Sequence, residues 1–457
     1  MKILFTNCEI LQRNINGKYY SIHGFLGVDG EYIDYIGENK PSNKYDLEKD
    51  MSGKLLMPGL INAHCHTPMT LLRGVGGGQS LQSWLNNCIF PIEAKMTPYD
   101  IEVGTRLAVA EMLRGGTTQV SEMYDFPYSS AKVFAETGMK ANLCRTGLCF
   151  DASLQMKDWP RFNEVIDVAK ILSLDKPGND ELFNEINCKT LPDYMKKAAK
   201  SGQVKGDLSV HSEYLSTSIF VKEMSKYANT TNYYRQVHAS ENKQEVEDCL
   251  ARQGTTPIMY LYNNGFLNGG HTYIAHCVHA TDEELEVMKK TGTTLVHNPT
   301  SNMKLGSGIA RISEALRLGV NVALGTDGCA SNNNLDMFEE MHLAALLQSG
   351  FNNDPTAASS HQVIDMATIN GARALGRPDT GLLEVKYKAD VIALDLSSPH
   401  LFPNHDIAEL IVYSAHASDV CLTMVDGKIL YEDGKYTTLD LDKIKQEANK
   451  VIEHLFK

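Results

Sequence analysis

The sequence predicts an α/β fold: a (β/α)₈ TIM-like barrel with a small composite β-sandwich domain formed by both chain ends. Three observations lead to this prediction. The 457 residues are enough for a barrel of about 250 residues plus a smaller domain. Strand-like and helix-like segments alternate through the middle of the chain, as in a parallel sheet. Both ends of the chain instead hold short strands separated by turns.

The two ends are interpreted as halves of one small β domain, residues 1–57 and 389–438. The expected strands are Lys2 to Leu11, Tyr19 to Val28, Tyr32 to Gly37, Ala389 to Leu396 and a hairpin pair from Val420 to Tyr436. Turn residues such as Asn16-Gly17 and Asp426-Gly427 separate them. A helix is expected over residues 439–457. The alternative is that each end packs separately on the barrel.

The barrel is expected to span residues 58–388. Its first full helix begins at Thr97-Pro98, with threonine as N-cap and proline at the first helical position, and ends at Gly115-Gly116. The expected strands are Lys54 to His64, Thr117 to Met123, Lys140 to Leu148, Gly206 to His211, Asn232 to His238, Tyr273 to Cys277, Thr293 to His297 and Val320 to Gly325. A doubly wound open sheet is the structural alternative.

Charge and cysteine usage narrow the class of protein. The net charge of −13, with acids and bases interspersed, disfavours nucleic acid or an anionic membrane as partner. The ten cysteines contain no C-x-x-C pair and fit a reducing compartment. The apolar start of the chain is too short for a signal peptide, and no apolar run approaches the roughly 20 residues of a membrane span. We therefore expect a soluble, cytoplasmic protein with a small-molecule substrate; a homo-oligomer stays open.

A histidine pair follows the first expected barrel strand. Residues i and i+2 of an extended strand point to the same side, so His64 and His66 face one site. Imidazole is a common ligand for divalent metals. The alternative is two ordinary polar residues at a strand end.

Other expected strands end in the same kinds of side chain. His238 closes one strand, His276 closes another and Asp327 follows a third, while Glu241 lies three residues beyond His238. The carboxyl ends of barrel strands meet at one mouth. Three imidazoles and one carboxylate there suit a single divalent ion that activates water. Each residue alone could equally belong to the core or cap a helix.

Several motifs resemble those of the amidohydrolase superfamily. They are Pro58–His66 (PGLINAHCH), Thr67–Gly74 (TPMTLLRG), His297–Leu305 (HNPTSNMKL) and Gly325–Met337 (GTDGCASNNNLDM). The first is similar to the entry motif of the superfamily, and the others are typical of its aromatic-heterocycle deaminases and chlorohydrolases. Together they most resemble the 5′-methylthioadenosine/S-adenosylhomocysteine deaminases, over nearly the whole chain.

The resemblance implies a role for each matching residue at the metal. His64, His66, His238 and Asp327 are implied to hold one divalent ion per chain, zinc first, with iron or manganese as alternatives. Glu241 is implied to shuttle a proton, His276 to position the water nucleophile, and Asp327 to take part in catalysis as well. A dinuclear relative adds a carboxylated lysine, and the matching strand here offers His211 instead, so a single metal is expected.

The same resemblance implies substrate contacts. Trp84 would give a thioether a flat apolar wall, and Glu93 would accept hydrogen bonds from ribose hydroxyls. Arg145 and Arg161 would meet an amino-acid carboxylate. His211 and Asn302 complete the expected substrate-binding residues. The alternatives are that Trp84 is core, that Glu93 is an N-terminal helix acid and that Arg145 is an ion-pair partner.

The chain also departs from the family pattern near the expected mouth. Glu213 stands where proline is usual, Glu122 stands where aspartate is common, and an insertion lies between Ile171 and Met195. These departures concern the substrate and not the reaction type.

The sequence therefore predicts an aminohydrolase. It would convert 5′-methylthioadenosine, S-adenosylhomocysteine or adenosine to the inosine counterpart and ammonia. A guanine or pterin deaminase, or a triazine chlorohydrolase, is the alternative on the same fold. A third hypothesis is an inactive relative that serves as a binding protein, and the presence of every expected ligand speaks against it.

Overall fold

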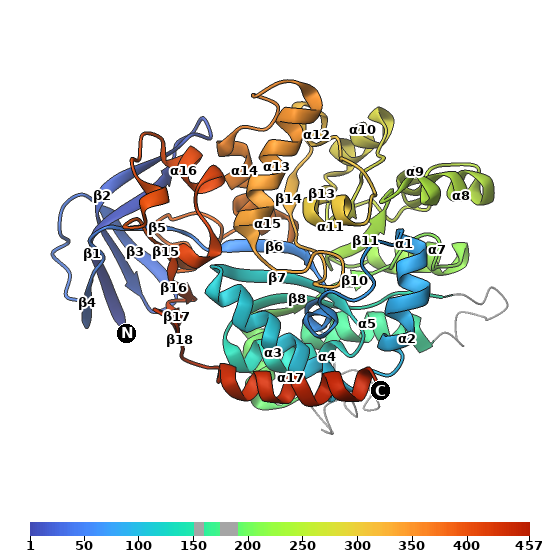
Figure 1. Cartoon of the computed structure of the whole chain (residues 1–457), viewed down its shortest axis with the longest axis horizontal. Helices are drawn as coiled ribbons and strands as arrows, with labels where there is room; N and C mark the ends of the chain where they lie inside the picture. Colours follow the sequence, from blue (N-terminus) through green and yellow to red (C-terminus); the bar gives the residue numbers. More distant parts are fainter. Residues whose placement is uncertain (150–159, 174–190) are drawn as a thin grey trace.

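The strands of the computed structural model, which describes residues 1–149, 160–173 and 191–457, fall into three sheets. One is a mixed sheet of nine strands; the other two are parallel sheets of five and four strands. In Figure 1 the mixed sheet lies at one end of the molecule, and helices cover the parallel strands in the rest.

The mixed sheet joins strands from the two ends of the chain. Its order is β18-β17-β16-β15-β5-β1-β2-β3, with β4 paired to β1. The bounds are β1 Lys2–Arg13, β2 Tyr19–Asp29, β3 Tyr32–Gly37, β4 Leu47–Asp50, β5 Lys54–Pro58, β15 Val391–Asp395, β16 Val420–Val425, β17 Lys428–Glu432 and β18 Lys435–Tyr436. The connection between the two ends is the antiparallel pair β5–β15, in which Val391 lies opposite Pro58 and Asp395 opposite Lys54.

All neighbouring strands in the other two sheets are parallel. The four-stranded sheet is β6 Leu60–Cys65, β7 Thr117–Tyr124, β8 Lys140–Arg145 and β9 Val204–Gly206. The five-stranded sheet is β10 Leu208–Ser209, β11 Arg235–Ala239, β12 Thr272–His276, β13 Thr294–His297 and β14 Val322–Leu324. Their residues are almost all buried, as in parallel sheets with both faces covered.

The two parallel sheets meet at both of their edges. Asp207 alone separates β9 from β10, and its N–H donates to Leu143 O of β8, whereas Leu208 N–H donates to Tyr234 O before β11. At the other edge, Asp327 N–H donates to His64 O at 3.0 Å, which ties the end of β14 to β6. The single strand that the sequence predicts over residues 206–211 is therefore divided at Asp207. Gly206 ends β9 in the four-stranded sheet, and Leu208–Ser209 form β10 in the five-stranded sheet.

The single strand expected from Lys54 to His64 is wrong, because the chain breaks at Gly59 into β5 and β6. Gly59 N–H donates to Asp390 O at 3.0 Å, so this residue is where the chain passes from the mixed sheet to the parallel one. A side chain would not fit, since a Cβ on Gly59 would lie 2.2 Å from Thr118 Cγ2. The glycine permits this close approach.

Helices follow the parallel strands in turn. After β6 come η1 Thr67–Leu72, α1 Leu81–Trp84, the π-turn η2 Leu85–Ile89, α2 Phe90–Glu93 and α3 Pro98–Arg114. The others are α4 Pro127–Thr137, α5 Pro160–Leu172, α6 Asp193–Lys200, α7 Ser218–Ala228, α8 Lys243–Gln253, α9 Pro257–Asn263, α10 Asp282–Thr291, α11 Pro299–Lys304, α12 Ile312–Leu318, α13 Met337–Asn352, α14 Ser360–Ala367, α15 Ile369–Ala374 and α16 Ile407–Tyr413. Within the described ranges, no helix has the length and apolar character needed to cross a bilayer.

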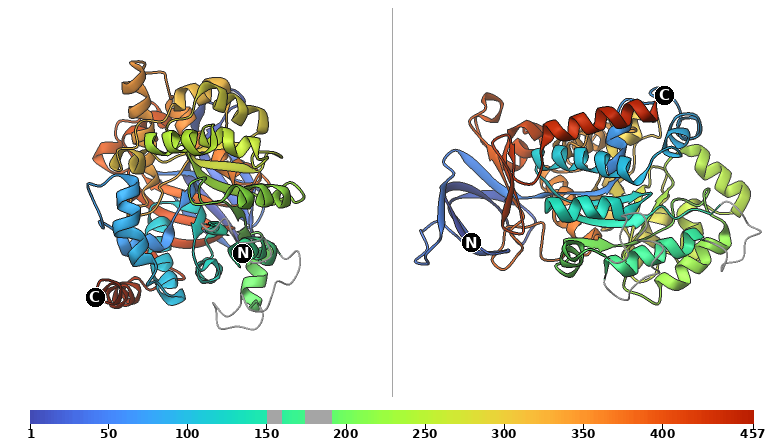
Figure 2. Two further views of the ribbon diagram at one scale, coloured as in Figure 1. Left: turned by 90° about the vertical axis from the view of Figure 1, so that its right-hand side faces the viewer. Right: turned by 90° about the horizontal axis from the view of Figure 1, so that it is seen from below.

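The chain ends in α17, Leu441–Leu455, which runs alongside α3 (Figures 1 and 2). Its inward residues Val451 and Leu455 belong to the same buried apolar cluster as Leu81, Trp84 and Ile89 of the α1–α2 segment. Lys95 Nζ also donates to Leu455 O at 3.1 Å. The C-terminal helix thus supports, from outside, the segment that covers the ends of the parallel strands.

Candidate metal centre and active-site cavity

The predicted ligands, and His276 with them, lie where parallel strands end. His64 is the second-last residue of β6 and His66 follows that strand, His238 and His276 are at the ends of β11 and β12, and Asp327 follows β14. Apart from His66, their exposed fractions are 1%, 5%, 1% and 6% in chain order, so each of these four is almost completely removed from water.

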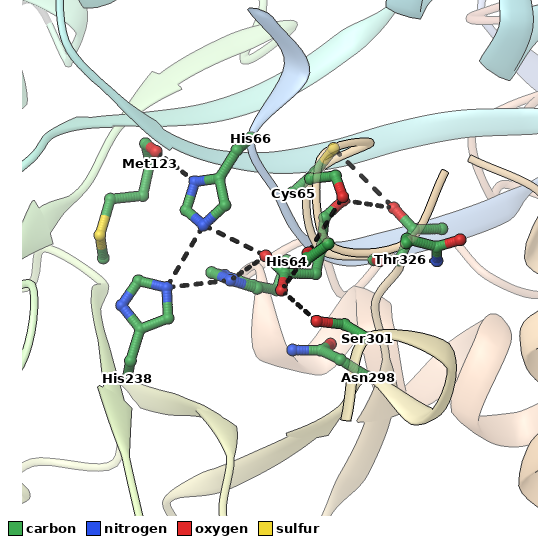
Figure 3. A network of polar contacts seen from close by, with 12 residues as sticks. His64, Cys65, His66, Met123, His238, Asn298, Ser301 and Thr326 are labelled. Carbon is green, nitrogen blue, oxygen red and sulfur yellow. Dashed lines mark hydrogen bonds and ion pairs between the residues drawn. The ribbon is translucent and has the colours of Figure 1, made fainter. Parts of the chain in front are cut away.

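Three imidazoles point their Nε2 atoms at one another (Figure 3). His238 Nε2 lies 3.1 Å from His64 Nε2 and 3.4 Å from His66 Nε2. Asp327 Oδ1 lies 3.2 Å from His66 Nε2 and 3.5 Å from His64 Nε2. The ligand atoms of His64, His276 and Asp327 also lie within 4.8 Å of one another. A single ion can therefore be reached by all of these groups.

The other nitrogen of each ring has an acceptor as its partner. His66 Nδ1 lies 2.6 Å from Met123 O, and His238 Nδ1 lies 2.7 Å from His211 O. His64 Nδ1 lies 3.3 Å from Gln236 Oε1. Since these oxygens only accept, each Nδ1 carries the hydrogen and each Nε2 presents a lone pair to the centre.

Two serine hydroxyl groups fix the carboxylate of Asp327. Ser301 Oγ and Ser331 Oγ donate to its Oδ2 at 2.7 and 2.8 Å, which leaves Oδ1 directed at the histidines. Asp327 has φ of 61° and His276 has φ of 77°. Left-handed backbone at residues with side chains is strained and is concentrated at functional sites.

The donor set fits a divalent cation. Nε2 lone pairs at these separations repel one another, and a positive charge between them removes the repulsion. Burial lowers the pKa of His64 to about 4, so its Nε2 stays unprotonated at neutral pH. The hydrogen bond to Asp327 overcomes burial and raises the pKa of His66 to about 9, so this position favours a positive charge, which a bound metal ion would supply in place of the proton. Three imidazole nitrogens and a carboxylate suit zinc, iron(II) or manganese(II).

Glu241 and His276 lie next to this centre. Glu241 Oε2 is 3.7 Å from His276 Nε2, and His276 Nδ1 is 2.8 Å from Asn302 Oδ1. Burial, reinforced by the charge of Asp327, raises the pKa of Glu241 well above its ordinary value. A carboxyl group that holds its proton near neutral pH can act as a general acid.

A cavity of about 260 Å³ opens onto these residues. The residues of the candidate metal centre in its wall are His66, His211, His238, Glu241, His276 and Asp327, and the others include Trp84, Leu85, Phe90, Glu93, Met96, Tyr124 and Phe126. Most of these other residues are apolar, with a few polar groups among them, as is usual for a small-molecule site.

Three of the predicted substrate residues, Trp84, Glu93 and His211, line the cavity. Glu93 Oε1 accepts a hydrogen bond from Tyr124 Oη at 2.5 Å, and burial raises its pKa to about 7. Trp84 Nε1 donates to Val75 O at 3.3 Å, so the edge of the indole is anchored.

Arg145 and Arg161 are not part of the cavity wall. Both contact Asp125, which does line the cavity, at 3.7 and 3.0 Å, and both contact Glu164, at 3.0 and 3.5 Å. Arg145 also lies over the ring of Phe126. Asn302 also lies outside the cavity wall, where its side chain contacts His276, whereas His211 is part of the wall.

The departures from the family pattern have partners in the structure. Glu122 is buried, and its Oε2 accepts the Thr67 N–H at 2.8 Å. Glu213 is buried and pairs with Arg252. Most of the insertion between Ile171 and Met195 lies outside the described residues.

Sequence reasoning missed the residues that hold the candidate site together. Ser301 lies in the motif of residues 297–305, and Ser331 lies in the motif of residues 325–337, four residues after Asp327. Hydroxyl side chains are too common in loops for these two to be singled out from the sequence. Tyr124, which bonds Glu93, could have been found because it ends a strand, β7, whose carboxyl end meets the others. Gln236 lies two residues before His238 in β11, on the same side of that strand.

Comparison with known proteins agrees with this arrangement. Residues 55–430 match the amidohydrolase family. The chain is 36% identical over 463 residues to a 5-methylthioadenosine/S-adenosylhomocysteine deaminase of Acetivibrio thermocellus, covering 100% of both chains. It is 37% identical to a 5′-deoxyadenosine deaminase of Methanosarcina barkeri, covering 95% of this chain and 94% of that one.

Among solved structures, an adenosine deaminase from Xanthomonas campestris with bound zinc superposes with a TM-score of 0.85 at 29% identity. The match covers 99% of this chain and 98% of that one. An atrazine chlorohydrolase from Arthrobacter aurescens shares the fold with a TM-score of 0.85 at 22% identity, covering 98% and 100%. With its family motifs, full-length relatives and converging strand-end histidines, the chain belongs to the amidohydrolase family.

Proposed function

We propose that the protein is a metal-dependent aminohydrolase that converts 5′-methylthioadenosine, S-adenosylhomocysteine or adenosine to the inosine counterpart and ammonia. One observation carries the proposal. A buried carboxyl group, Glu241, and a buried imidazole, His276, flank a three-histidine centre in a cavity that Glu93 also lines. The full-length relatives named as deaminases of adenosine derivatives support it.

His64, His66, His238 and Asp327 would hold the ion, with zinc as the first candidate. When bound there, a divalent ion would supply a water nucleophile at neutral pH, since such ions lower the pKa of bound water to about 7. We expect elemental analysis of metal-replete protein to find one ion per chain, and His238→Ala to lose it. Two ions per chain, or none, would contradict the ligand set.

The chain's own residues would move the protons. Asp327 accepts a proton from the water as the water oxygen bonds to C6 of the purine. Glu241 gives a proton to N1, so that negative charge does not build up on the ring, and His276 orients the water. The proton held by Asp327 then goes to the amino group, the C6–N bond breaks and ammonia leaves. The hydroxyl on C6 returns its proton to Glu241 as the C6 carbonyl forms.

Glu93 and Trp84 would select a nucleoside. The Glu93 carboxylate can accept hydrogen bonds from ribose hydroxyls, and Trp84 with Leu85 and Met96 gives an apolar surface for a 5′ substituent. A base without ribose leaves Glu93 desolvated and without that partner, which costs binding energy.

We also infer the architecture that presents this site. The two parallel sheets, which meet at both edges, would form one closed (β/α)₈ barrel over residues 58–388. The mixed sheet would be a separate composite domain built from residues 1–57 and 389–438, with residues 439–457 as the C-terminal helix.

The decisive experiment is ammonia release from a panel of 5′-methylthioadenosine, S-adenosylhomocysteine, adenosine, adenine, guanine, a pterin and atrazine. The adenosine derivatives should be converted with the highest kcat/KM. If guanine, the pterin or the triazine is preferred, the substrate assignment fails while the metal centre stands.

A further inference from the structure

Glu245, in the first turn of α8, points its carboxylate back toward the end of β11. It is 2% exposed, and its two oxygens accept two consecutive backbone N–H groups. Ser240 N–H donates to Oε1 at 2.8 Å, and Glu241 N–H donates to Oε2 at 2.7 Å. The side chain therefore holds the peptide groups on both sides of the Ser240 Cα.

This stretch of backbone needs such support. Ser240 has φ of 55°, in the left-handed region that disfavours residues with a Cβ. The turn must place Glu241 over the cavity only three residues after His238. Asn242 caps α8, because its side chain accepts the Glu245 N–H at 2.9 Å. Glu245 therefore bonds to the turn through its backbone as well as through its side chain.

We propose that Glu245 is a positioning residue that fixes the backbone of Glu241, and thereby its carboxyl group, for proton transfer to the substrate. The inference rests on the proton-shuttle role proposed for Glu241. It adds a residue that touches neither the ion nor the cavity, since Glu245 is not among the lining side chains.

An acid is required at this position for a geometric reason. A carboxyl group offers one oxygen to each of the two N–H groups at once. Glutamine has the same size but only one oxygen, so its NH₂ group would face one of the two N–H donors. Proton transfer needs donor and acceptor within about 2.6–3.2 Å, so a small displacement of Glu241 is costly.

The test compares Glu245→Gln with Glu241→Gln and with the double variant. We expect Glu245→Gln to lower kcat about 10- to 100-fold, since small misplacements of reacting groups have effects of this size. Its KM for 5′-methylthioadenosine and its metal content should stay near those of the parent. Because Glu245 acts through Glu241, adding Glu245→Gln to Glu241→Gln should lower kcat by less than about 3-fold further.

Glu284 provides the matched control. It is also completely buried, lies in the first turn of α10, and accepts the Thr281 N–H at 2.7 Å and the Thr256 hydroxyl. Glu284→Gln should lower the thermal midpoint as much as Glu245→Gln does while leaving kcat within about 2-fold. If the glutamine at position 245 prevents folding, Glu245→Asp, which keeps the carboxyl group but reaches less far, is measured instead.

The outcomes separate the two proposals. A Glu245→Gln enzyme with unchanged kcat, or with a loss that multiplies fully with that of Glu241→Gln, overturns the positioning role. An unchanged kcat in Glu241→Gln itself instead overturns the proton shuttle, whatever Glu245 does.

Discussion

Glu241 is enclosed by protein on one side and faces the cavity on the other, which is the environment of a carboxyl group that must give up a proton to substrate. Glu241→Gln removes that proton but keeps the shape, so kcat should fall by about 10²–10⁴-fold, the usual contribution of general acid–base catalysis. Elemental analysis should show the metal retained, because the ligands are unchanged. Near-normal turnover would remove Glu241 from the role.

Glu93 governs the distinction between nucleoside and base. Glu93→Ala should raise KM for 5′-methylthioadenosine by at least about 10-fold, since a hydrogen bond to a charged group is worth about 1.5–3 kcal/mol. KM for free adenine should change far less, because adenine lacks the ribose. The measurement is steady-state kinetics on both substrates, and equal effects on the two would place Glu93 outside ribose recognition.

For single residues, the sequence predicts the candidate metal ligands better than it predicts the neighbours of each side chain. His64 and His66 are found from strand periodicity, and His238 and Asp327 from their positions after other strands. Arg145 shows the limit. The family resemblance implies a substrate contact for Arg145, but the direction of its side chain depends on Asp125 and Glu164, which come from different segments of the chain. Side-chain pairing between distant segments leaves no periodic signal in the sequence.

Among the elements, α17 has the least expected connection to the site. Leu455 is fully buried in the cluster that includes Trp84, whereas Ile452 on the same helix is 37% exposed. Leu455→Ala should lower the free energy of unfolding by about 2–4 kcal/mol, as in other core truncations, and Ile452→Ala by less than about 0.5.

The same pair of variants tests whether α17 supports the cavity wall. Leu455→Ala should raise KM for nucleosides more than Ile452→Ala, because the α1–α2 segment loses packing behind Trp84. Thermal melts and kinetics on the two proteins are sufficient. Equal stability of the two variants would show that α17 packs only superficially.

Element boundaries explain where the fold prediction succeeds and fails. The start of α3 is predictable because Thr97 and Asp100 form a capping box and proline follows the cap, all of it local chemistry. The division between β5 and β6 cannot be predicted in this way, because residues 55–61 form one apolar run whose two halves pair with different sheets. The break is shown by contacts with distant residues, the hydrogen bond from Gly59 N–H to Asp390 O and the close approach of Gly59 to Thr118.

For the whole molecule, the contact between the mixed sheet and the parallel strands includes a buried ion cluster. Lys140 Nζ of β8 lies 2.7 Å from both Asp390 Oδ2 and Asp426 Oδ1. Asp390 directly precedes β15, and Asp426 directly follows β16. Lys140→Met leaves Asp390 without its cation, and Asp426 keeps only the more distant Lys388 ammonium, 3.7 Å away. The free energy of unfolding should fall by about 3–5 kcal/mol, the usual result of breaking a buried pair.

Lys132 is the control for this prediction. Its ammonium lies 2.8 Å from Glu102 Oε1, but the side chain is 29% exposed. Lys132→Met should cost less than about 1 kcal/mol, as for other surface pairs. Chemical denaturation of both variants gives the comparison, and similar losses would show that the Lys140 cluster does not hold the sheets together.

The β5–β15 pairing also sets an order of events during synthesis. The edge of β5, with Leu55, Leu56 and Met57, leaves the ribosome about 330 residues before its partner β15. At about 5–20 residues per second, that edge waits roughly 20 to 70 seconds for its neighbour. An apolar strand with open hydrogen-bonding groups invites pairing with other chains. Nascent chains are therefore most prone to aggregate late in translation, and a ribosome-bound holdase that covers residues 54–58 would act where the need is greatest.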